Sequence, residues 1–581
     1  MINLKAKPFS LDDEAVAWVN TTLAKMTMEE KIGQLFVNMG TSRDETYLRQ
    51  AVAKYQFGGV RYNPASAADI HEQNRILQDA SRIPLLIAAN TEAGGNGACT
   101  DGTEVGLHVK IGATGDPRYA YELGRVSGVE AAAVGCNWSF APIVDIHRNW
   151  RNPIVSSRCF SQDADVVLAM GREYMRGIGE SGIACAMKHF PGDGVDERDQ
   201  HLSTSVNSMT RQEWDESFGK VYSGLIDAGI PSVMVGHILL PAHSKELLPA
   251  TLSHELVTGL LKTKLGFQGV VVTDASHMVG LTGVMRRRDL VPAAIAAGCD
   301  LFLFFNDPDE DFGYMLEGYR AGVITDERLN DAMTRILGLK ASLGLPEKQA
   351  AGTLVPPKQA ALASIGLPAN KALFAEVADK AITLVKNVGN PILPLTPGRY
   401  PRLLLVPVKG PDNPAASFFG VGKGPQPTEL LAELLRAQGF EVTIFESLFN
   451  KILKLGEDER RTAVLNMYAG KAAVAEFTAA YDAVINVANV IGGMQPVERI
   501  SWPASKGTPD IPWYVHELPT VFVSVACPFH LADAPQVKCY INTYDGRPAT
   551  MELLVEKLLG RSPFLGTSPV DAFCGFVDTH L

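Results

Sequence analysis

At 581 residues the chain is too long for one ordinary domain, and we expect at least two. With 46% hydrophobic and 20% charged residues, its composition is typical of a soluble globular protein with large cores. The formal net charge is −11 and no long basic cluster occurs, which argues against a nucleic acid or an anionic membrane surface as a partner.

The sequence shows few signs of targeting or of covalent cross-linking. Residues 1–20 contain no apolar run that could serve as the core of a signal peptide. No stretch approaches the roughly 18 consecutive apolar residues of a membrane-spanning helix. The eight cysteines are scattered and form no CxxC pair, so neither a disulfide framework nor a zinc site is expected. We therefore predict a cytoplasmic protein that does not bind membranes.

The chain begins with a predicted helix over residues 23–36. Thr27 is suited to cap this helix, because Glu30 follows three residues later as the partner of a capping box. Beyond it, short apolar segments alternate with amphipathic helical stretches. The apolar segments are 35–38, 58–63, 84–90, 136–142, 183–190, 232–238, 269–275 and 300–306, and the helical stretches include 67–80, 117–134, 164–181, 211–228 and 254–265.

The eight apolar segments predict eight strands. They are nearly continuous in apolar character, as parallel strands that are buried on both faces should be. Strand–helix alternation at this count favours a closed eight-stranded β/α barrel. A doubly wound open sheet is the alternative, because periodicity alone does not separate the two.

A second alternating region follows a stretch rich in proline, glycine and alanine. We interpret residues 346–369 as a linker between a barrel domain at 1–345 and a second domain at 370–581. Five strands with intervening helices predict a smaller doubly wound α/β sandwich domain. No G-x-G-x-x-G run precedes a helix there, so no dinucleotide cofactor is expected. The strands are predicted at 402–408, 441–445, 483–490, 520–527 and 537–544, and the helices at 429–438, 457–481 and 549–559.

Polar residues stand at or just beyond the ends of the predicted barrel strands. In a barrel these residues converge on one rim, where barrel enzymes place their chemistry. Each could instead cap a helix, and for Asn63 and Asn306 that alternative is equally good. We predict a substrate pocket at this rim. The residues are Asn63, Asn90, Glu92, Asp145, Lys188, His189, His237, Asp274 and Asn306.

Two features of this part of the sequence suit glycosyl transfer. Asp274 directly follows a strongly β-prone run, so its carboxylate is mounted on a rigid element, as a covalent nucleophile should be; a helix N-cap is the alternative. In the loop after 183–190, Asp199 and His201 can point to one side, so that Asp199 orients the ring of His201 as a proton donor. Retaining glycosidases need a nucleophile and a separate donor. Glu92 and Asp145 are weaker candidates for the donor.

Several motifs resemble those of glycoside hydrolase family 3, and most closely those of its bacterial β-N-acetylglucosaminidase branch. KHFPGDG (188–194) and the following D-x-H (199–201) resemble that branch's KHFPGHG and D-S-H. GVVVTDASHM resembles the segment that carries its nucleophile. FAPIVDIHRNWRNPIVSSRCFSQD (140–163) resembles the family's F-A-P-x-x-D…N-P…R-x-F-G-x-D stretch, and LVKNVGNPILPL (384–395) is similar to the start of its C-terminal α/β domain. The resemblance spans most of the chain.

The resemblance implies roles for individual residues. Asp274 is the implied nucleophile, and His201, oriented by Asp199, is the implied acid and base. The expected substrate-binding residues are Arg158, Lys188 and His189, which match the family's sugar-binding positions, together with Asn90, Glu92 and His237. The sequence departs from the family pattern at Asn90, where the strand-end D-x-E has aspartate, and at Asp193, where the branch has histidine. The Asp-x-His loop argues against the β-glucosidase branch, which takes its acid from the C-terminal region.

The activity implied is that of a retaining exo-β-N-acetylglucosaminidase on small glycosides derived from cell walls or chitin. The expected partner is a small carbohydrate, no metal or organic cofactor is implied, and the sequence leaves a monomer and a homodimer open. The alternatives are a β-glucosidase, another exo-glycosidase of the family, or a glycoside phosphorylase. Phosphorolysis enters because His201 becomes neutral after giving up its proton and does not repel an anionic acceptor. The presence of both Asp274 and His201 argues against a non-catalytic sugar-binding protein.

Overall fold

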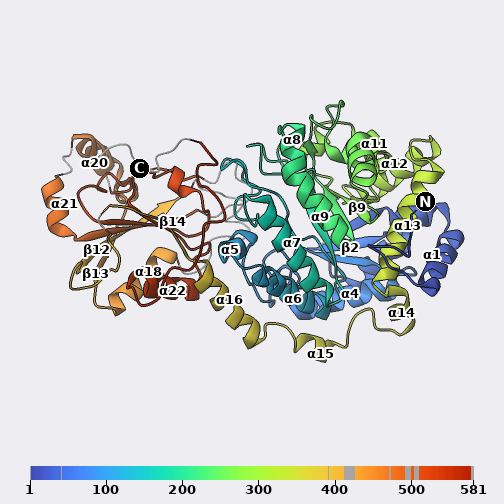
Figure 1. The fold of residues 1–581 in the computed structure, drawn as a ribbon, viewed down its shortest axis with the longest axis horizontal. Coiled ribbons are helices and arrows are strands. Elements are labelled where there is room, and N and C mark those ends of the chain that lie inside the picture. The colour runs from blue at the N-terminus through green and yellow to red at the C-terminus, as the bar shows by residue number, and fades with distance from the viewer. Residues whose placement is uncertain are drawn as a thin grey trace. The chain divides into compact units, whose positions relative to one another are not determined.

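The structure is a computed structural model, and it describes residues 2–40, 42–389, 391–410, 426–469, 473–490, 499–502 and 509–576. The chain divides into two compact units. The first comprises Met1–Ile111 and Asp116–Phe374, and the second comprises Gly112–Gly115 and Ala375–Leu581. Each unit has its own sheet (Figure 1).

The first unit is a closed barrel of eight parallel strands, which confirms the predicted fold. All eight predicted segments form its strands. Each strand pairs in parallel with the next, and β1 closes the barrel against β10, with Phe36 opposite Phe302. The strands are β1 (Phe36–Gly40), β2 (Gly59–Tyr62), β3 (Leu86–Ala89), β4 (Trp138–Ser139), β5 (Ala184–Phe190), β7 (Ser232–Val235), β9 (Val270–Ala275) and β10 (Leu301–Leu303).

Helices surround these strands, as Figure 1 shows for α4, α6, α7 and α9. Apolar residues at helical spacing explain the inner faces: in α4, for example, Ile70, Ile76 and Leu77 are buried. The bounds of the main helices are α1 (Asp13–Lys25), α2 (Met28–Gln34), α3 (Glu45–Tyr55), α4 (Ala67–Ala80), α6 (Arg118–Ala133), α7 (Ala164–Gly179), α9 (Lys220–Ala228), α11 (Arg287–Ala297), α12 (Pro308–Arg320) and α13 (Asp326–Ser342).

Three predicted helices of the first unit differ from the structure in detail. The helix expected over 23–36 is two helices, because α1 ends at Lys25 and Thr27 starts α2. The predicted capping box is confirmed: Thr27 accepts from the N–H of Glu30, and Glu30 accepts from the N–H of Thr27. The stretch 211–228 is α8 (Arg211–Trp214), a π-helical turn (Asp215–Gly219) and α9, and the stretch 254–265 is π-helical over Glu255–Lys264.

The second unit is built on a six-stranded sheet in the order β11-β16-β15-β14-β12-β13. The five predicted strands are β12 (Arg402–Lys409), β13 (Glu441–Ile444), β14 (Ala483–Asn489), β15 (Thr520–Ser524) and β16 (Cys539–Asn542), all parallel. The prediction missed β11 (Thr383–Asn387), which pairs antiparallel with β16 at the edge. Apolar clusters cover both faces of the sheet, and one includes residues of α18 (Pro427–Ala437) and α22 (Pro548–Leu558).

The segment predicted as a linker contains short helices. These are α14 (Leu345–Ala350) and α15 (Lys358–Leu362), which belong to the first unit, and α16 (Pro368–Ala381) runs across the division at Phe374. The segment is bound to the barrel unit by hydrogen bonds. His71 Nε2 lies 2.7 Å from the carbonyl oxygen of Pro356, and Gln349 Nε2 donates to the carbonyl of Ser81 at 2.9 Å.

Two further findings concern the part of the chain that the structure describes. None of its helices is long and apolar enough to cross a membrane. Within the same residues, no cluster of histidine, cysteine and carboxylate side chains has the makeup to hold a metal ion.

Candidate active site

The predicted rim residues lie at the carboxyl ends of the barrel strands. Lys188 and His189 belong to β5 and Asp274 belongs to β9. The others follow β2, β3, β4, β7 and β10 within a few residues; they are Asn63, Asn90, Glu92, Asp145, His237 and Asn306. Because all eight strands run parallel around one barrel, their carboxyl ends form one rim.

Asp274 is a partly buried carboxylate with one oxygen fixed by the backbone. Its Oδ1 accepts from the N–H of Ala275 at 2.7 Å, and its Oδ2 lies 3.9 Å from Nε2 of His189. Burial by itself would raise the pKa of Asp274. The histidines 189, 237 and 201, together with the N–H of Ala275, outweigh burial and lower this pKa below its usual value. Asp274 is therefore an ionised carboxylate on a rigid strand end.

His201 and Asp199 form the predicted pair. One carboxylate oxygen of Asp199, Oδ1, accepts from the backbone N–H of His201 at 2.8 Å and lies 2.7 Å from its ring Nδ1. Asp199 is buried, whereas 42% of the His201 side chain is exposed. Burial lowers the pKa of His201, but Asp199 and, more weakly, Asp274 outweigh it and raise this pKa. With Nδ1 bound to Asp199, Nε2 is the nitrogen available to a substrate.

The loop that carries His201 is held from several sides. The backbone of Val279 donates to the carbonyl of His201 at 3.1 Å, and that of Gly280 donates to the carbonyl of Gln200 at 3.0 Å. A Cβ at Gly280 would lie only 2.5 Å from the Gln200 carbonyl oxygen, so this close approach requires glycine. A two-stranded ribbon of β6 (Ser205–Val206) and β8 (Ile238–Leu239) joins the loop to the segment after β7.

Gln200, between the two members of the pair, is a positioning residue that the sequence analysis missed. Its buried amide donates from Nε2 to Asp193 Oδ2 at 3.2 Å and accepts at Oε1 from the N–H of His237 at 2.8 Å. It thereby links the loops that follow β5 and β7. The only signal in the sequence is its place between Asp199 and His201.

Glu92 is the centre of a buried ion cluster. It binds Arg158 through two hydrogen bonds of 2.9 Å, and Lys188 Nζ donates to its Oε1 at 2.6 Å. Burial would raise the pKa of Glu92, but the two cations overcome it and hold this pKa well below its usual value. For Lys188 burial is the larger influence, and it lowers the pKa. The structure thus brings three of the predicted substrate-binding residues together.

His189 is fixed by Asp145. The carboxylate of Asp145 accepts from the backbone N–H of His189 at 3.0 Å and lies 2.7 Å from the ring Nδ1. This places Nε2 of His189 on the side of Asp274. Asp145 also accepts from the N–H of Asp193, whose own carboxylate binds Asn152 and Gln200. Burial and, second, the Asp145 charge raise the pKa of Asp193 to about 6.

His237 has protein partners on both ring nitrogens. Its Nε2 lies 3.0 Å from the carbonyl oxygen of Ala275, and its Nδ1 lies 2.8 Å from the hydroxyl of Thr251. Because a carbonyl only accepts, Nε2 carries the proton, and burial lowers the pKa of this ring. His237 therefore supports the backbone next to Asp274. Its predicted contact with substrate stays a prediction.

The three asparagines at the rim differ from one another. Asn63 Oδ1 accepts from Arg61 Nη1, and the backbone N–H of Asn306 donates to Asp311 at 2.6 Å. The helix-cap alternative is wrong for both, because Ser66 caps α4 and Asp307 caps α12. Asn90 is partly exposed, and among the described residues its side chain has no hydrogen-bond partner. It is thus available to a ligand.

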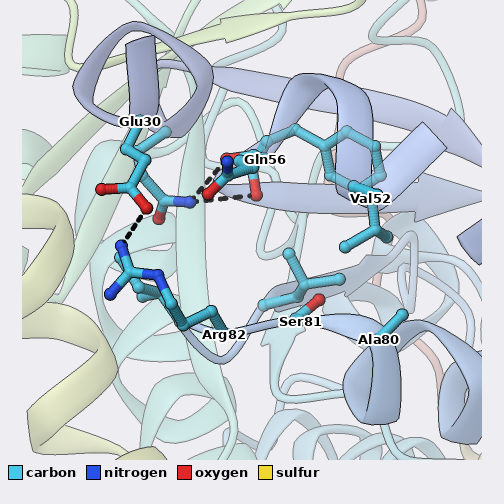
Figure 2. A pocket seen from close by; sticks show the side chains of 11 residues that line it. Glu30, Val52, Gln56, Ala80, Ser81 and Arg82 are labelled. Carbon is cyan, nitrogen blue, oxygen red and sulfur yellow. Dashed lines mark hydrogen bonds and ion pairs between the residues drawn. The ribbon is translucent and has the colours of Figure 1, made fainter. Parts of the chain in front are cut away.

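A pocket of about 280 Å³ lies elsewhere on the barrel unit (Figure 2). Its lining residues Gln34, Phe57 and Leu85 precede β1, β2 and β3, so it is at the amino ends of these strands. In Figure 2, Glu30 and Arg82 point toward each other across it. Barrel enzymes place their chemistry at the opposite rim, so we do not assign this pocket to catalysis.

Comparisons with known proteins identify the family of this chain. The model of the glycosyl hydrolase family 3 N-terminal domain matches residues 27–339. A beta-N-acetylglucosaminidase/beta-glucosidase of Cellulomonas fimi is 44% identical over 592 residues, which covers 100% of both chains. The chain belongs to glycoside hydrolase family 3. The family predicted from the motifs is confirmed, and with it the prediction of a glycoside hydrolase.

Two solved structures resemble this chain over nearly all of its length. One is a structure named "Beta-glucoside phosphorylase BglX", which is 36% identical with a TM-score of 0.87 and covers 99% of each chain. The other is a family 3 beta-N-acetylglucosaminidase from Paenibacillus, which is 25% identical with a TM-score of 0.74 and covers 94% of this chain and 99% of its own. Both units of the chain therefore belong to the family fold.

Proposed function

We propose that this family 3 glycosidase is a retaining exo-β-N-acetylglucosaminidase acting on small glycosides. The observation that carries the proposal is the pairing at one rim of an ionised carboxylate, Asp274, with His201, an imidazole held by Asp199. The relative from Cellulomonas fimi bears both the β-N-acetylglucosaminidase and the β-glucosidase name, so the sugar at the non-reducing end is part of the proposal.

In the first step, Asp274 attacks the anomeric carbon while the bond to the leaving oxygen breaks. His201, protonated on both nitrogens, gives its Nε2 proton to that oxygen and becomes neutral. In the second step, Nε2 takes a proton from water, the oxygen of that water attacks the anomeric carbon, and the bond to Asp274 breaks. Two inversions give overall retention.

Asp199 keeps its negative charge throughout and holds Nδ1–H of His201. It therefore stabilises the imidazolium before each glycosylation step and fixes the ring so that Nε2 is presented to the leaving group. Glu92, Arg158 and Lys188 offer oxygen acceptors and N–H donors to the hydroxyls of the sugar.

The test compares an aryl N-acetylglucosaminide with the matching glucoside. A site that hydrogen-bonds the 2-acetamido group rejects an analogue without it by ~10⁴-fold or more in kcat/KM. Comparable values for the two substrates would refute the preference. Trapping with a fluorosugar, followed by mass spectrometry of peptides, should place the label on Asp274; a label on another residue would refute its role.

We propose phosphorolysis as a second candidate for the second step. A carboxylate base would repel an anionic acceptor, whereas His201 is neutral when the acceptor arrives. The phosphorylase name of a structure that is 36% identical to this chain gives independent support. The oxygen of phosphate would then attack the anomeric carbon, the bond to Asp274 would break, and a glycosyl phosphate with retained configuration would form. NMR of the products in phosphate and in a non-nucleophilic buffer at equal pH decides between the two acceptors.

A further inference from the structure

Arg61 is a cation of the barrel rim to which neither the sequence analysis nor the proposed mechanism assigns a role. It is the third residue of β2 and is partly buried. Its Nη1 donates to the amide oxygen Oδ1 of Asn63, and it lies 3.7 Å from the sulfur of Met39. Among the described residues, no carboxylate forms an ion pair with it.

The direction of the Arg61 side chain follows from its neighbours on β2. A Cβ on Gly40 of the adjacent strand would meet Val60, Tyr62 and the Nε2 of Gln73 in α4, so Val60 and Tyr62 face the helices. Successive side chains on a strand point to opposite faces, and Arg61 therefore faces the barrel interior. Its bond to Asn63, which lies beyond the strand end, brings the guanidinium to the carboxyl-end rim.

The electrostatic neighbours of Arg61 connect it with the catalytic pair. Burial lowers its pKa, and Glu92 acts in the opposite direction. The pKa of His277 is lowered by burial first, then by His201, and also by Arg61, while Asp274 raises it. His277 is thus within electrostatic reach of Arg61, His201 and Asp274. Arg61 also stands near the carboxyl end of β2 and is bonded to Asn63 beyond that end, so it lies on the same rim as Asp274.

Arg61 differs from the other two cations of the site in its partners. Arg158 and Lys188 each form an ion pair with Glu92, at 2.9 and 2.6 Å, whereas Arg61 has an uncharged amide as its acceptor. Holding a cation in a partly buried place without an anion costs free energy, which a bound anion would offset. An N-acetylhexosaminyl or glucosyl residue carries no charge. The anion must therefore belong to the other reactant.

We propose that Arg61, assisted by Asn63, binds an oxyanion of the group that leaves or enters opposite the glycosyl residue. The inference rests on the glycosidase function proposed above and names the chemistry of its acceptor or aglycone. The oxyanion comes from one of two sources: inorganic phosphate as the acceptor, or a carboxylate or phosphate carried by the leaving group. A guanidinium suits both, because its planar fork can donate two parallel hydrogen bonds to either oxyanion.

The first measurement uses the partition of one glycosyl-enzyme between phosphate and water. Wild type and Arg61→Met are supplied with the same aryl glycoside at a fixed phosphate concentration, and glycosyl phosphate and free sugar are quantified by NMR. Both products arise from the same intermediate, so their ratio reports the acceptor alone. Loss of a charge-assisted hydrogen bond should lower this ratio by roughly 10–100-fold. Arg61→Lys keeps the positive charge but loses the planar guanidinium. Its product ratio should lie between those of wild type and Arg61→Met.

The second measurement identifies the other source. Two aryl glycosides that differ by one carboxylate on the ring are compared through the ratio of their kcat/KM values. If the leaving group supplies the oxyanion, this ratio falls in Arg61→Met while the partition ratio does not. The matched control is Arg49→Met, an arginine of α3 whose exposed side chain is paired with Glu45. Both ratios should equal those of wild type in this control.

The proposal is overturned if Arg61→Met and Arg61→Lys leave both ratios equal to wild type within error. Should wild type cleave no glycoside at all, the proposed function fails but the inference is still decided. In that case, phosphate binding is titrated by ³¹P NMR against wild type and the Arg61 variants. Weaker binding by the variants alone would support an oxyanion site, and equal binding would refute it. Thermal unfolding of each variant shows whether it is folded.

Discussion

The two ends of the barrel contain similar kinds of residues. They differ in how many of the polar atoms have hydrogen-bond or ion-pair partners within the protein. At the amino end, Asp300 precedes β10, accepts from Lys262 Nζ at 2.9 Å and from the N–H of Val271 at 2.8 Å, and is paired with Arg328. At the carboxyl end, Asp274 uses one oxygen for a backbone N–H; its other oxygen lies 3.9 Å from Nε2 of His189 and, among the described residues, accepts no hydrogen bond. The first carboxylate is fully engaged, and the second keeps an oxygen for a ligand.

This difference indicates how one barrel can separate stability from function. A buried carboxylate whose oxygens all have protein partners ties elements together, and removing it leaves its partners as uncompensated charges. A carboxylate with an unused oxygen contributes less to the fold but can react. We therefore expect substitutions at the carboxyl end to change activity more than stability, and substitutions at the amino end to do the reverse.

The largest effect is expected for Asp274→Ala. Loss of the nucleophile should lower kcat by about 10⁴–10⁶-fold, because no other carboxylate of the rim has a comparable place on a strand end. The thermal unfolding midpoint should stay near that of wild type, since Asp274 has few partners. A variant that retained more than a few per cent of activity would remove Asp274 from the mechanism.

His201→Ala should cost less than Asp274→Ala and should depend on the leaving group. With poor leaving groups the loss should reach roughly 10²–10⁴-fold, the usual worth of general acid catalysis. Activated aryl glycosides do not need protonation, so their cleavage to the intermediate should be affected much less. Steady-state and burst kinetics over a series of leaving groups measure this difference. A uniform loss across the series would overturn the role of proton donor.

At the amino end, Asp300→Ala tests the other half of the comparison. It leaves Lys262 and Arg328 without their buried partner, and breaking such a network typically costs about 3–5 kcal/mol of unfolding free energy. Denaturant unfolding of the barrel unit measures the loss, and kcat of the folded enzyme should stay at the wild-type value. Lost activity in a variant of unchanged stability would contradict the proposed division between the two ends.

The pH dependence of kcat/KM sharpens the role of Asp199. The pKa of His201 is raised from 6.5, so its protonated form persists above that pH, and the basic limb of the wild-type profile should lie above 6.5. In Asp199→Asn the carboxylate charge is removed, the pKa of His201 falls, and the limb should move to lower pH. A limb that did not move would show that another group controls it.

The smallest effect is expected for Thr27→Ala in the cap of α2, next to the amino-end pocket. The substitution removes the hydroxyl that accepts from the N–H of Glu30, and loss of such a cap costs about 1 kcal/mol of stability. The change is measured by denaturant unfolding. Thr27→Ser, which keeps the hydroxyl, is the control and should remain close to wild type.

Much of the fold could be predicted because it depends on local patterns. All eight barrel strands are buried on both faces, so each shows as a short apolar run that needs no knowledge of its neighbours. The edge strand β11 was missed because it lacks such a run. Residues Thr383–Asn387 include two partly buried residues and an exposed one, and only pairing with β16 makes them a strand. The cap at Thr27 was predicted, but the end of α1 at Lys25 was missed because the helical pattern continues across it.

The chemistry of single residues and the local pair of Asp199 with His201 were also open to prediction, whereas partnerships between distant segments were not. A carboxylate at a strand end and an Asp-x-His loop led to the prediction of Asp274, Asp199 and His201 as catalytic residues. The bonds that occupy His237, the link that Gln200 makes between two loops, and the unneutralised guanidinium of Arg61 all join residues from different strands and loops. Local sequence determined which residue types stand at the strand ends. Only closure of the barrel decided which of these residues bond to one another and which keep polar atoms available to a ligand.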